Sequence, residues 1–314
     1  MQIELSVVMS VYNAEPFLKE AIESILNQTF KKFEFIVVND GSTDNSLDVI
    51  NSFNDDRIVL IDQENIGLSR SLNKGVFISK GKFIARMDAD DISLPERFAL
   101  QLDFLRKNKD YVLLGSNIYF IDIKGKILDQ TNLPCLNEDM KKSLPNIKLM
   151  HSSAMFLREF FFKAGEYPVE IPKYFEDKIL WNKMAEFGKI ATLPDVLVKY
   201  RLVPSSIFNL SNKQVQQLKD LSNKIIKNNY LLTEYDKFSI KEITRISKNQ
   251  QIGNYFLRIS FMHFKHNRRV KALFYVVKSF AINPFETDTL KMFMKILLPT
   301  RLLNFYRKLK QKPL

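Results

Sequence analysis

The sequence contains one cysteine, Cys135, in 314 residues. A single thiol cannot form an intramolecular disulfide, so nothing indicates an oxidising compartment and we expect a reduced, cytoplasmic setting. The N-terminus has no basic segment, and its apolar run at 5–11 is short and interrupted by serines, so it predicts a strand and not a signal peptide. No stretch reaches the roughly 18 unbroken apolar residues that span a bilayer.

Three kinds of catalytic motif are also missing. The sequence has no Gly-rich phosphate loop of the Walker or dinucleotide type, no Cys/His spacing for zinc, and no Gly-x-Ser-x-Gly turn. These absences exclude several common nucleotide-binding, zinc-binding and hydrolase architectures.

Positive charge is concentrated in the C-terminal third. The chain has a net charge of +12, yet from Lys213 onward 21 Lys and Arg stand against 6 Asp and Glu, so the residues before Lys213 are slightly acidic. We expect either a face that lies on an anionic membrane, or a solvated face over helices that pack on the rest of the protein. The apolar residues of this region are Phe261, Phe264, Leu273, Phe274, Phe280, Phe293, Leu297, Leu298 and Phe305.

The first hundred residues alternate β-rich runs with amphipathic runs, a βαβ rhythm that favours a parallel sheet with helices on both faces. Strands are predicted at 5–11, 35–38, 58–61 and 83–87, with helices at 18–26, 46–53 and 68–79. Ligands of such sheets bind beyond the carboxyl ends of the strands. The four polar loops at 10–13, 39–44, 63–65 and 88–91 should therefore meet at one edge and present several carboxylates.

The rest of the chain is less regular. Strands are predicted at 112–116, 118–121 and 153–157, with a turn at Lys124 and Gly125. From 213 to 314 the pattern predicts successive helices, interrupted at Pro284 and Pro299. We expect an α/β domain at 1–210 with two halves, 1–100 and 101–210, and a basic helical region at 211–314.

The strongest local signal is Asp88-Ala89-Asp90-Asp91, directly after an apolar strand. Crowded carboxylates attract a cation, and a divalent ion held by one or two carboxylates can neutralise a departing diphosphate. The alternative is that these residues only cap the next helix.

Taken together, the loops resemble those of glycosyltransferase family 2, the inverting enzymes with an α/β, Rossmann-like GT-A fold. The resemblance covers about residues 5–206. Its motifs are 6–13 (SVVMSVYN), 37–44 (VVNDGSTD), 65–70 (NIGLSR) with Asn73, 88–91 (DADD), 151–156 (HSSAMF), and 174–177 (YFED) followed by Leu180 and Trp181.

The resemblance implies that 1–210 is a catalytic domain, with 1–100 the nucleotide-sugar half and 101–210 the acceptor half, and that the first half holds a donor site. It assigns Asp90 to a divalent metal, Mn²⁺ or Mg²⁺, and Asp91 to a supporting or capping role. It assigns Asp40 to the nucleobase, with Tyr12 and Asn13 lining the base pocket. The full set implied for the nucleotide sugar is Ser10, Tyr12, Asn13, Asp40, Arg70 and Asp88. A histidine often follows the strand-ending Tyr-Arg of the family, but Leu202 follows Arg201 here, which puts any further histidine contact to the metal in doubt.

The resemblance makes Asp177 the general base. An inverting transfer needs a carboxylate that takes the proton of the acceptor hydroxyl as its oxygen attacks the anomeric carbon. The alternative is that Glu176 and Asp177 only interact favourably with a helix N-terminus. On the acceptor side we expect His151, at the start of the 153–157 strand, together with Glu176 and Trp181.

The resulting hypothesis is a metal-dependent hexosyltransferase that uses a UDP sugar in preference to dTDP or GDP sugars. The acceptor would be a saccharide or lipid-linked saccharide in surface polysaccharide or lipooligosaccharide synthesis, with the enzyme peripheral on the inner face of the cell membrane. One alternative is transfer to a polyprenyl phosphate. A distant one is a non-catalytic nucleic-acid-binding protein, which the acidic strand ends disfavour because they repel phosphate.

Overall fold

The computed structural model describes residues 3–170, 175–204, 206, 209–284 and 286–298. The chain forms two compact units. The first comprises residues up to Arg201 together with Lys219–Ile240, and the second comprises Leu202–Leu218 with the residues after Ile240. The helix α8 (Asn212–Lys227) contributes to both units.

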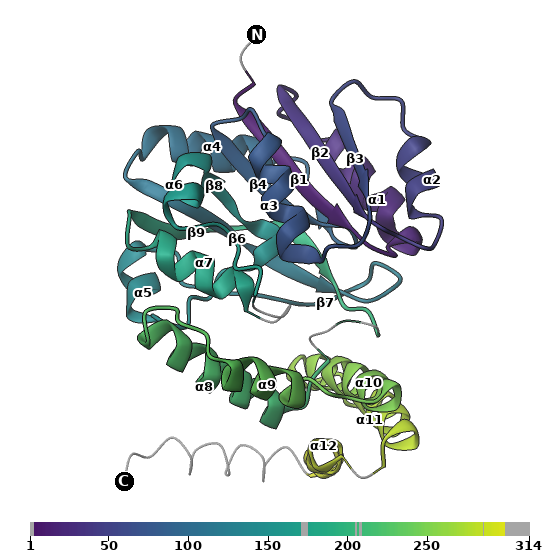
Figure 1. The fold of residues 1–314 in the computed structure, drawn as a ribbon. Helices are drawn as coiled ribbons and strands as arrows, with labels where there is room; N and C mark the ends of the chain where they lie inside the picture. Colours follow the sequence, from purple (N-terminus) through teal and green to yellow (C-terminus); the bar gives the residue numbers. More distant parts are fainter. Residues whose placement is uncertain (1–2, 171–174, 205, 207–208, 285, 299–314) are drawn as a thin grey trace. The chain divides into compact units, whose positions relative to one another are not determined.

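Within the described residues, nine strands form one mixed sheet in the first unit (Figure 1). The four strands predicted for the first hundred residues are present, parallel, and adjacent in the order β3-β2-β1-β4. Their bounds are β1 Leu5–Val11, β2 Phe33–Asp40, β3 Ile58–Gln63 and β4 Phe83–Asp88. Their carboxyl ends therefore share one edge, as expected for a site built from strand-end loops.

Helices cover both faces of this sheet. On one face, α1 (Glu15–Leu26), α2 (Ser46–Asn51) and α4 (Arg97–Lys107) pack on alternate residues of β1, β2 and β4. The other face is covered by α3 (Leu68–Ile78), α5 (Asn137–Lys142), α6 (Arg158–Lys163) and α7 (Glu176–Met184). Because successive side chains of a strand point to opposite faces, buried strands of this kind form two cores.

The remaining strands are β5 (Ile92–Ser93), β6 (Tyr111–Ile121), β7 (Ile127–Gln130), β8 (Met155–Leu157) and β9 (Lys189–Arg201). The prediction of separate strands at 112–116 and 118–121 was wrong, because β6 is continuous. Asn117, at the predicted break, stays in the strand because its amide donates to Pro194 O at 3.1 Å and its Oδ1 accepts from Thr131 and Leu133. The register shifts on either side of Asn117.

His151 lies in a 3₁₀ turn, η1 (His151–Ser153), and not at the start of a strand as predicted. The turn is closed by Ser153 N and Oγ, which both donate to Met150 O, at 3.0 and 2.9 Å. The strand β8 begins two residues later, at Met155. The turn places His151 beside the end of β4, where Arg86 Nε donates a hydrogen bond to its ring.

The helices predicted after residue 213 are present as far as the structure describes the chain. They are α8, α9 (Glu234–Ile243), α10 (Lys248–Lys265), α11 (Arg269–Ile282) and α12 (Thr287–Leu297). Pro284 separates α11 from α12 as expected, whereas Pro299 and Phe305 lie outside the described residues. No helix among the described ranges is both long and apolar enough to cross a membrane.

Candidate active site

Two loops at the carboxyl edge of the sheet are joined by polar contacts. Asn13, after β1, has φ 50°, and its Oδ1 accepts a hydrogen bond from Thr43 N at 2.8 Å. In return Ser42 Oγ accepts from Asn13 N at 3.1 Å. Ala14 N donates to Ser46 Oγ at 2.9 Å. These contacts fix the β1–α1 loop against the β2–α2 loop.

Asp40, at the end of β2, fixes a third loop. Its Oδ1 accepts from Ile66 N at 2.8 Å and Gln63 Nε2 at 3.1 Å, and its Oδ2 accepts from Gly67 N at 3.0 Å. Gly67 precedes the first residue of α3, so Asp40 supplies an acceptor that the helix N-terminus lacks. Asp40 is 2% exposed, and a nucleobase donor would have to share these oxygens with the three donors already bound to them.

The loop after β2 and the loop after β3 approach so closely that a side chain at residue 41 would not fit. Gly41 has φ 68°, and a Cβ at this position would lie 2.5 Å from Asn65 N. Glycine alone meets both the left-handed backbone and the close contact without strain. The Asp40-Gly41 turn is therefore more than a polar surface turn.

The other predicted donor residues lie at this edge too. Ser10 pairs in register with Asp88 across β1 and β4. Tyr12 is 48% exposed, and Arg70 is exposed in the first turn of α3. Within the described part of the chain Arg70 forms no ion pair, so its guanidinium is available for an anionic ligand.

The end of β4 is a concentrated charge cluster. Arg86 is 2% exposed, and its Nη2 lies 2.5 Å from Asp88 Oδ1. The hydroxyl of Ser152 contacts one carboxylate oxygen each of Asp88 and Asp91. The charge of Arg86 outweighs the cost of burial and lowers the pKa of Asp88, so Asp88 is held ionised.

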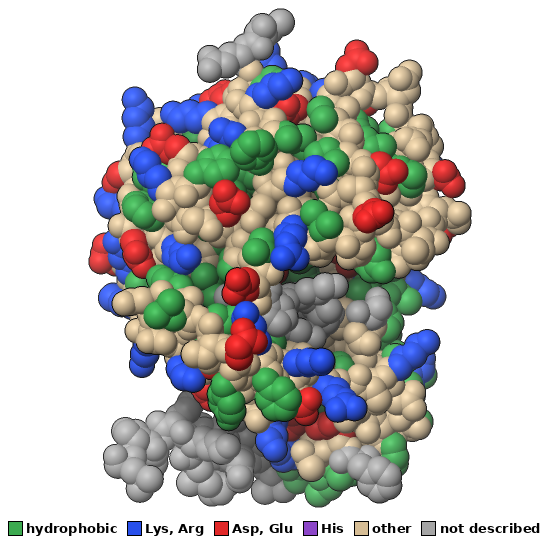
Figure 2. All heavy atoms as spheres, in the orientation of Figure 1, with side chains coloured by type: hydrophobic (Ala, Val, Ile, Leu, Met, Phe, Trp, Pro, Cys, Tyr) green, Lys and Arg blue, Asp and Glu red, His purple; other side chains and the backbone are tan. Residues whose placement is uncertain are grey.

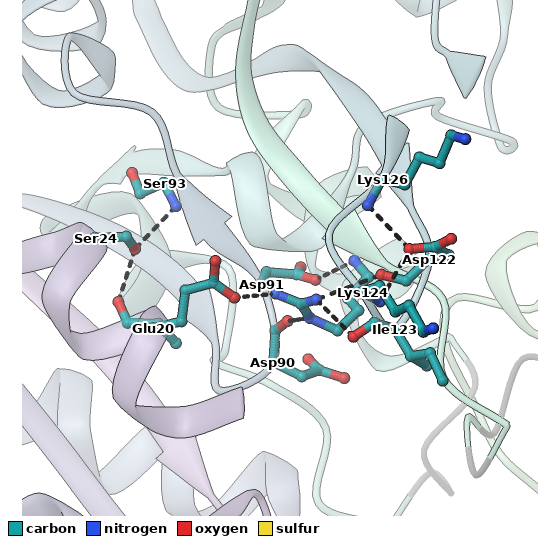
Figure 3. A network of polar contacts seen from close by, with 11 residues as sticks. Glu20, Ser24, Asp90, Asp91, Ser93, Asp122, Ile123, Lys124 and Lys126 are labelled. Atoms are coloured by element: carbon teal, nitrogen blue, oxygen red, sulfur yellow. Dashed lines mark hydrogen bonds and ion pairs between the residues drawn. The ribbon is translucent and has the colours of Figure 1, made fainter. Parts of the chain in front are cut away.

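Asp91 contacts the same Ser152 hydroxyl as Asp88 and does not cap α4, which begins at Arg97. It is buried, and its Oδ1 accepts from Arg201 N at 2.8 Å. The Arg201 side chain donates to Asp90 O at 2.9 Å and forms an ion pair with Glu20 at 2.5 Å. Figure 3 shows Glu20, Asp90 and Asp91 meeting in this network. The strand-ending Arg201 thus anchors the acidic loop.

Asp90 is arranged differently from its neighbours. Its half-buried carboxylate accepts no hydrogen bond from another described residue and points away from the network in Figure 3. Burial, and next the negative charge of Asp88, raise the pKa of Asp90 to about 7. A divalent cation would offset this repulsion, so Asp90 fits a metal ligand. No three His, Cys, Asp or Glu of the described residues form a metal-binding group, so further ligands would come from Asp88, substrate oxygens and water.

On its other side, Arg86 reaches the residues expected near the acceptor. Its Nε lies 3.2 Å from His151 Nε2, and that nitrogen lies 2.8 Å from Tyr167 Oη. The rings of His151 and Trp181 pack edge to face with centroids 5.9 Å apart. Burial, and next the positive charge of Arg86, lower the pKa of His151 well below its usual range, so the imidazole is neutral at pH 7.

The α7 helix begins with the predicted acidic pair. Asp177 Oδ1 accepts from Lys178 N at 2.6 Å, and burial raises the pKa of Asp177 to about 6. Glu176 is 4% exposed, and burial followed by the charge of Asp177 raises its pKa to about 8. Two adjacent carboxyls with separated pKa values are typical of a site in which one group accepts a proton. Tyr174, the first residue of this motif, lies outside the described residues.

Lys178 fixes the helix that carries Asp177. Its Nζ donates to Asn146 Oδ1 at 2.9 Å, to Ser222 Oγ at 2.6 Å and to Asn223 Oδ1 at 2.8 Å. Ser222 and Asn223 belong to the part of α8 that packs in the first unit. The expected boundary at residue 210 separates α8 from the catalytic domain, whereas these contacts join part of α8 to it.

The polar residues that sequence reasoning missed are Arg86, Ser152, Tyr167 and Lys178. Arg86 offered a signal, because a charged residue within the apolar run 83–87 must be paired when the strand is buried. Tyr167 and Lys178 offered none, because their partners come from distant segments.

Comparison with solved structures identifies the fold. The chain is similar to TarS 1–349 of S. aureus in complex with UDP-GlcNAc, with TM-score 0.55, 15% identity, and coverage of 93% of this chain and 90% of that one. It is also similar to the mannosyltransferase PcManGT of Pyrobaculum calidifontis in complex with GDP-Man and Mn²⁺, with TM-score 0.57, 16% identity, and coverage of 97% and 88%. The predicted GT-A fold with a helical C-terminal region is thereby confirmed.

Sequence comparison gives the family. Residues 6–164, just over half of the chain, match the family described as Glycosyl transferase family 2. The chain is also 32% identical over 203 residues to the amylovoran biosynthesis glycosyltransferase AmsE of Erwinia amylovora, which covers 62% of this chain and 75% of AmsE. The protein belongs to glycosyl transferase family 2 and is a glycosyltransferase.

Proposed function

We propose that the protein is an inverting, metal-dependent hexosyltransferase whose base is Asp177. The observation that carries the proposal is the contact chain from Asp88 through Arg86 and His151 to Trp181, which lies on the same helix as Asp177. One buried guanidinium thus connects the acidic end of β4 with the helix of the base. A displacement reaction needs its donor and its base on such a common frame.

In the proposed reaction the acceptor hydroxyl attacks the anomeric carbon of the donor. The Asp177 carboxylate takes the hydroxyl proton while the new C–O bond forms. The bond from the anomeric carbon to the diphosphate oxygen breaks, and the nucleoside diphosphate leaves with the electron pair. Attack from the side opposite the leaving group inverts the anomeric configuration.

Asp90, with Asp88 beside it, would hold Mn²⁺ or Mg²⁺. When bound, the cation neutralises charge that develops on the departing diphosphate. Arg70 would contact the phosphates from the α3 side, and Tyr12, Asn13 and Asp40 would contain the base. Buried polar atoms without a hydrogen-bond partner among the described residues, Glu176 Oε2 and Trp181 Nε1, suit hydroxyl groups of a sugar.

We favour a UDP sugar as donor, since Asp40 can accept from the imide N–H of uracil and TarS, of the same fold, was solved with UDP-GlcNAc. We favour a saccharide or lipid-linked saccharide acceptor in surface polysaccharide or lipooligosaccharide synthesis, because the relative AmsE acts in amylovoran biosynthesis. The basic C-terminal region would hold the enzyme on the inner face of the cell membrane, near such acceptors. Family membership favours this enzyme over a nucleic-acid-binding protein.

Thermal unfolding tests the donor and the metal. A ligand that binds only the folded state raises the unfolding midpoint. At a free ligand concentration of a hundred times Kd, it adds about 2.7 kcal/mol to the free energy of unfolding. We expect a UDP sugar to raise the midpoint only with Mn²⁺ or Mg²⁺, and dTDP and GDP sugars to raise it less. Asp90→Asn should abolish the metal-dependent part, while Asp103→Asn, an exposed carboxylate on α4, should not. A chain that no nucleotide sugar stabilises would contradict the proposal.

The acceptor is tested by product analysis. With the donor identified, soluble oligosaccharides and short-chain polyprenyl phosphates would be offered separately. Transfer to the oligosaccharide with inverted configuration supports the proposal. Transfer to the lipid phosphate alone would favour the polyprenyl-phosphate glycosyltransferase instead.

A further inference from the structure

The second unit has its own small apolar core. Ala272, Val276, Met292 and Ile296 are buried between α11 and α12. Phe264, Leu273 and Phe293, three of the apolar residues that the sequence marked as candidates for a membrane face, pack against this core. Their partial burial against this core already accounts for these three side chains. The remaining apolar residues of these helices are the ones that need an explanation.

Two exposed apolar stripes remain, one on each helix. On α11, Val270, Phe274 and Val277 are 84, 55 and 49% exposed. On α12, Leu290, Met294 and Leu297 are 46, 61 and 57% exposed. Spacings of four and three residues place each set along one side of its helix. Arg269 Nη1 donates to Leu298 O at 2.9 Å, so the start of α11 and the end of α12 are adjacent.

Cations accompany these stripes. Lys278 Nζ lies 4.5 Å from the centre of the exposed Phe274 ring. Lys291 and Lys295 are exposed on α12 beside the apolar stripe. The described residues of the second unit contain 12 Lys and Arg against 3 Asp and Glu. In the lower part of Figure 2, hydrophobic, basic and some acidic side chains lie intermixed over the C-terminal helices.

We propose that the exposed stripes of α11 and α12, with their flanking lysines, form a face that binds an anionic lipid bilayer. A helix that lies in the interface needs an apolar stripe for the acyl boundary and cations for the headgroups, and these helices provide both. The excess of positive charge is complementary to anionic lipid and would repel a second copy of the same face. The consequence for a lipid-linked acceptor rests on the proposed function, whereas the lipid binding itself does not.

Co-sedimentation of the full-length protein with vesicles tests the face. We compare vesicles of phosphatidylcholine alone with vesicles that also contain phosphatidylglycerol. The protein should bind the anionic vesicles, and binding should weaken as salt is raised. Removing one cation, in Lys278→Gln or Lys295→Gln, should lower the partition coefficient roughly fivefold. Phe274→Glu, which also places a carboxylate in the stripe, should lower it at least as much.

The matched control is Phe238→Glu, on α9 in the first unit, where Phe238 is also exposed, at 62%. It should bind vesicles like the unmodified protein. Equal vesicle binding of Phe274→Glu and unmodified protein would overturn the proposal. If the unmodified protein does not bind vesicles and Phe274→Glu has a lowered unfolding midpoint, the face packs within the chain. If light scattering shows a dimer of the unmodified protein that Phe274→Glu loses, the face binds a second copy.

Donor stabilisation in solution separates this proposal from the transferase. If Phe274→Glu loses the vesicles but keeps the metal-dependent shift with a nucleotide sugar, the lipid face is supported independently. If the parent binds vesicles and no nucleotide sugar, the proposed function fails while the lipid face stands.

Discussion

Arg86 Nε lies 3.2 Å from His151 Nε2, while Nη2 of the same guanidinium lies 2.5 Å from Asp88. His151 is held there by the η1 turn and by Tyr167, and Asp88 by Ser152. The geometry of the donor side and that of the acceptor side therefore depend on one planar group. Lysine cannot replace it, because an ammonium lacks the fixed fork of donors.

Arg86→Lys should keep the buried charge but lose one of the two contacts. A displacement of about 1 Å in a catalytic group can cost on the order of 100-fold in rate, so we expect kcat to fall by about that factor with a smaller change in donor affinity. Steady-state kinetics and donor titration would measure the two effects. Arg106→Lys, in an exposed ion pair with Glu4, is the matched control. Unchanged kcat in Arg86→Lys would show that simultaneous contact with His151 and Asp88 is not needed for turnover.

Asp177→Asn should separate catalysis from binding. The amide keeps the shape of the side chain but cannot take a proton, and general base catalysis contributes typically 10²- to 10⁴-fold. We expect kcat to fall by that range while the metal-dependent donor affinity stays nearly constant. Full turnover in this variant would place the base elsewhere in the chain.

The pH dependence of kcat should report the same carboxyl. Burial raises the pKa of Asp177 to about 6, so the ionised base is fully present only above that pH. Activity should fall about tenfold for each pH unit below the pKa, measured at saturating metal and donor. A profile that stays level down to pH 4.5 would exclude a base with this raised pKa.

Glu176→Gln should stabilise the protein at alkaline pH. The folded-state pKa of Glu176 is raised from 4.5 to about 8 by burial and by Asp177. The folded chain then binds this proton more tightly than the unfolded chain, so the stabilisation is complete below pH 4.5 and lost as pH rises to about 8. Glutamine mimics the neutral form at every pH. We expect equal midpoints near pH 4.5 and a higher one for the variant at pH 8.5.

At pH 8.5 the unfolding midpoint of Glu176→Gln should exceed that of the unmodified protein by about 3 °C if the substitution adds roughly 1 kcal/mol to the free energy of unfolding. Glu159→Gln, an exposed residue on α6, should show no such pH-dependent difference. Lower stability of Glu176→Gln at pH 8.5 would mean that the ionised carboxylate is paired.

The sequence was sufficient for the strand-end architecture because β1–β4 follow local rules. Each is a short apolar run, and each is followed by a polar loop. It was insufficient where distant partners decide the outcome. Pro194 interrupts the strand pattern of β9 in the sequence, and the register of β9 with β6 shifts at that residue. The hydrogen bond from Ser153 Oγ to Met150 O stabilises the η1 turn where the start of a strand was predicted. The resemblance singled out Asp90, but only the structure shows that, among the described residues, its carboxylate lacks the partners that Asp88 and Asp91 have.

Lys178→Met should show that part of α8 belongs to the catalytic frame. Methionine keeps the length of the side chain but removes the donors that Asn146, Ser222 and Asn223 receive. Unpaired, partly buried acceptors cost about 1–3 kcal/mol, so the unfolding midpoint should fall by several degrees. Because the same helix carries Asp177, kcat should fall more than donor affinity. Lys227→Met, exposed on α8, should change neither quantity. If Lys178→Met matched the unmodified protein in both, α8 would be an appendage and the boundary near residue 210 would be preferred.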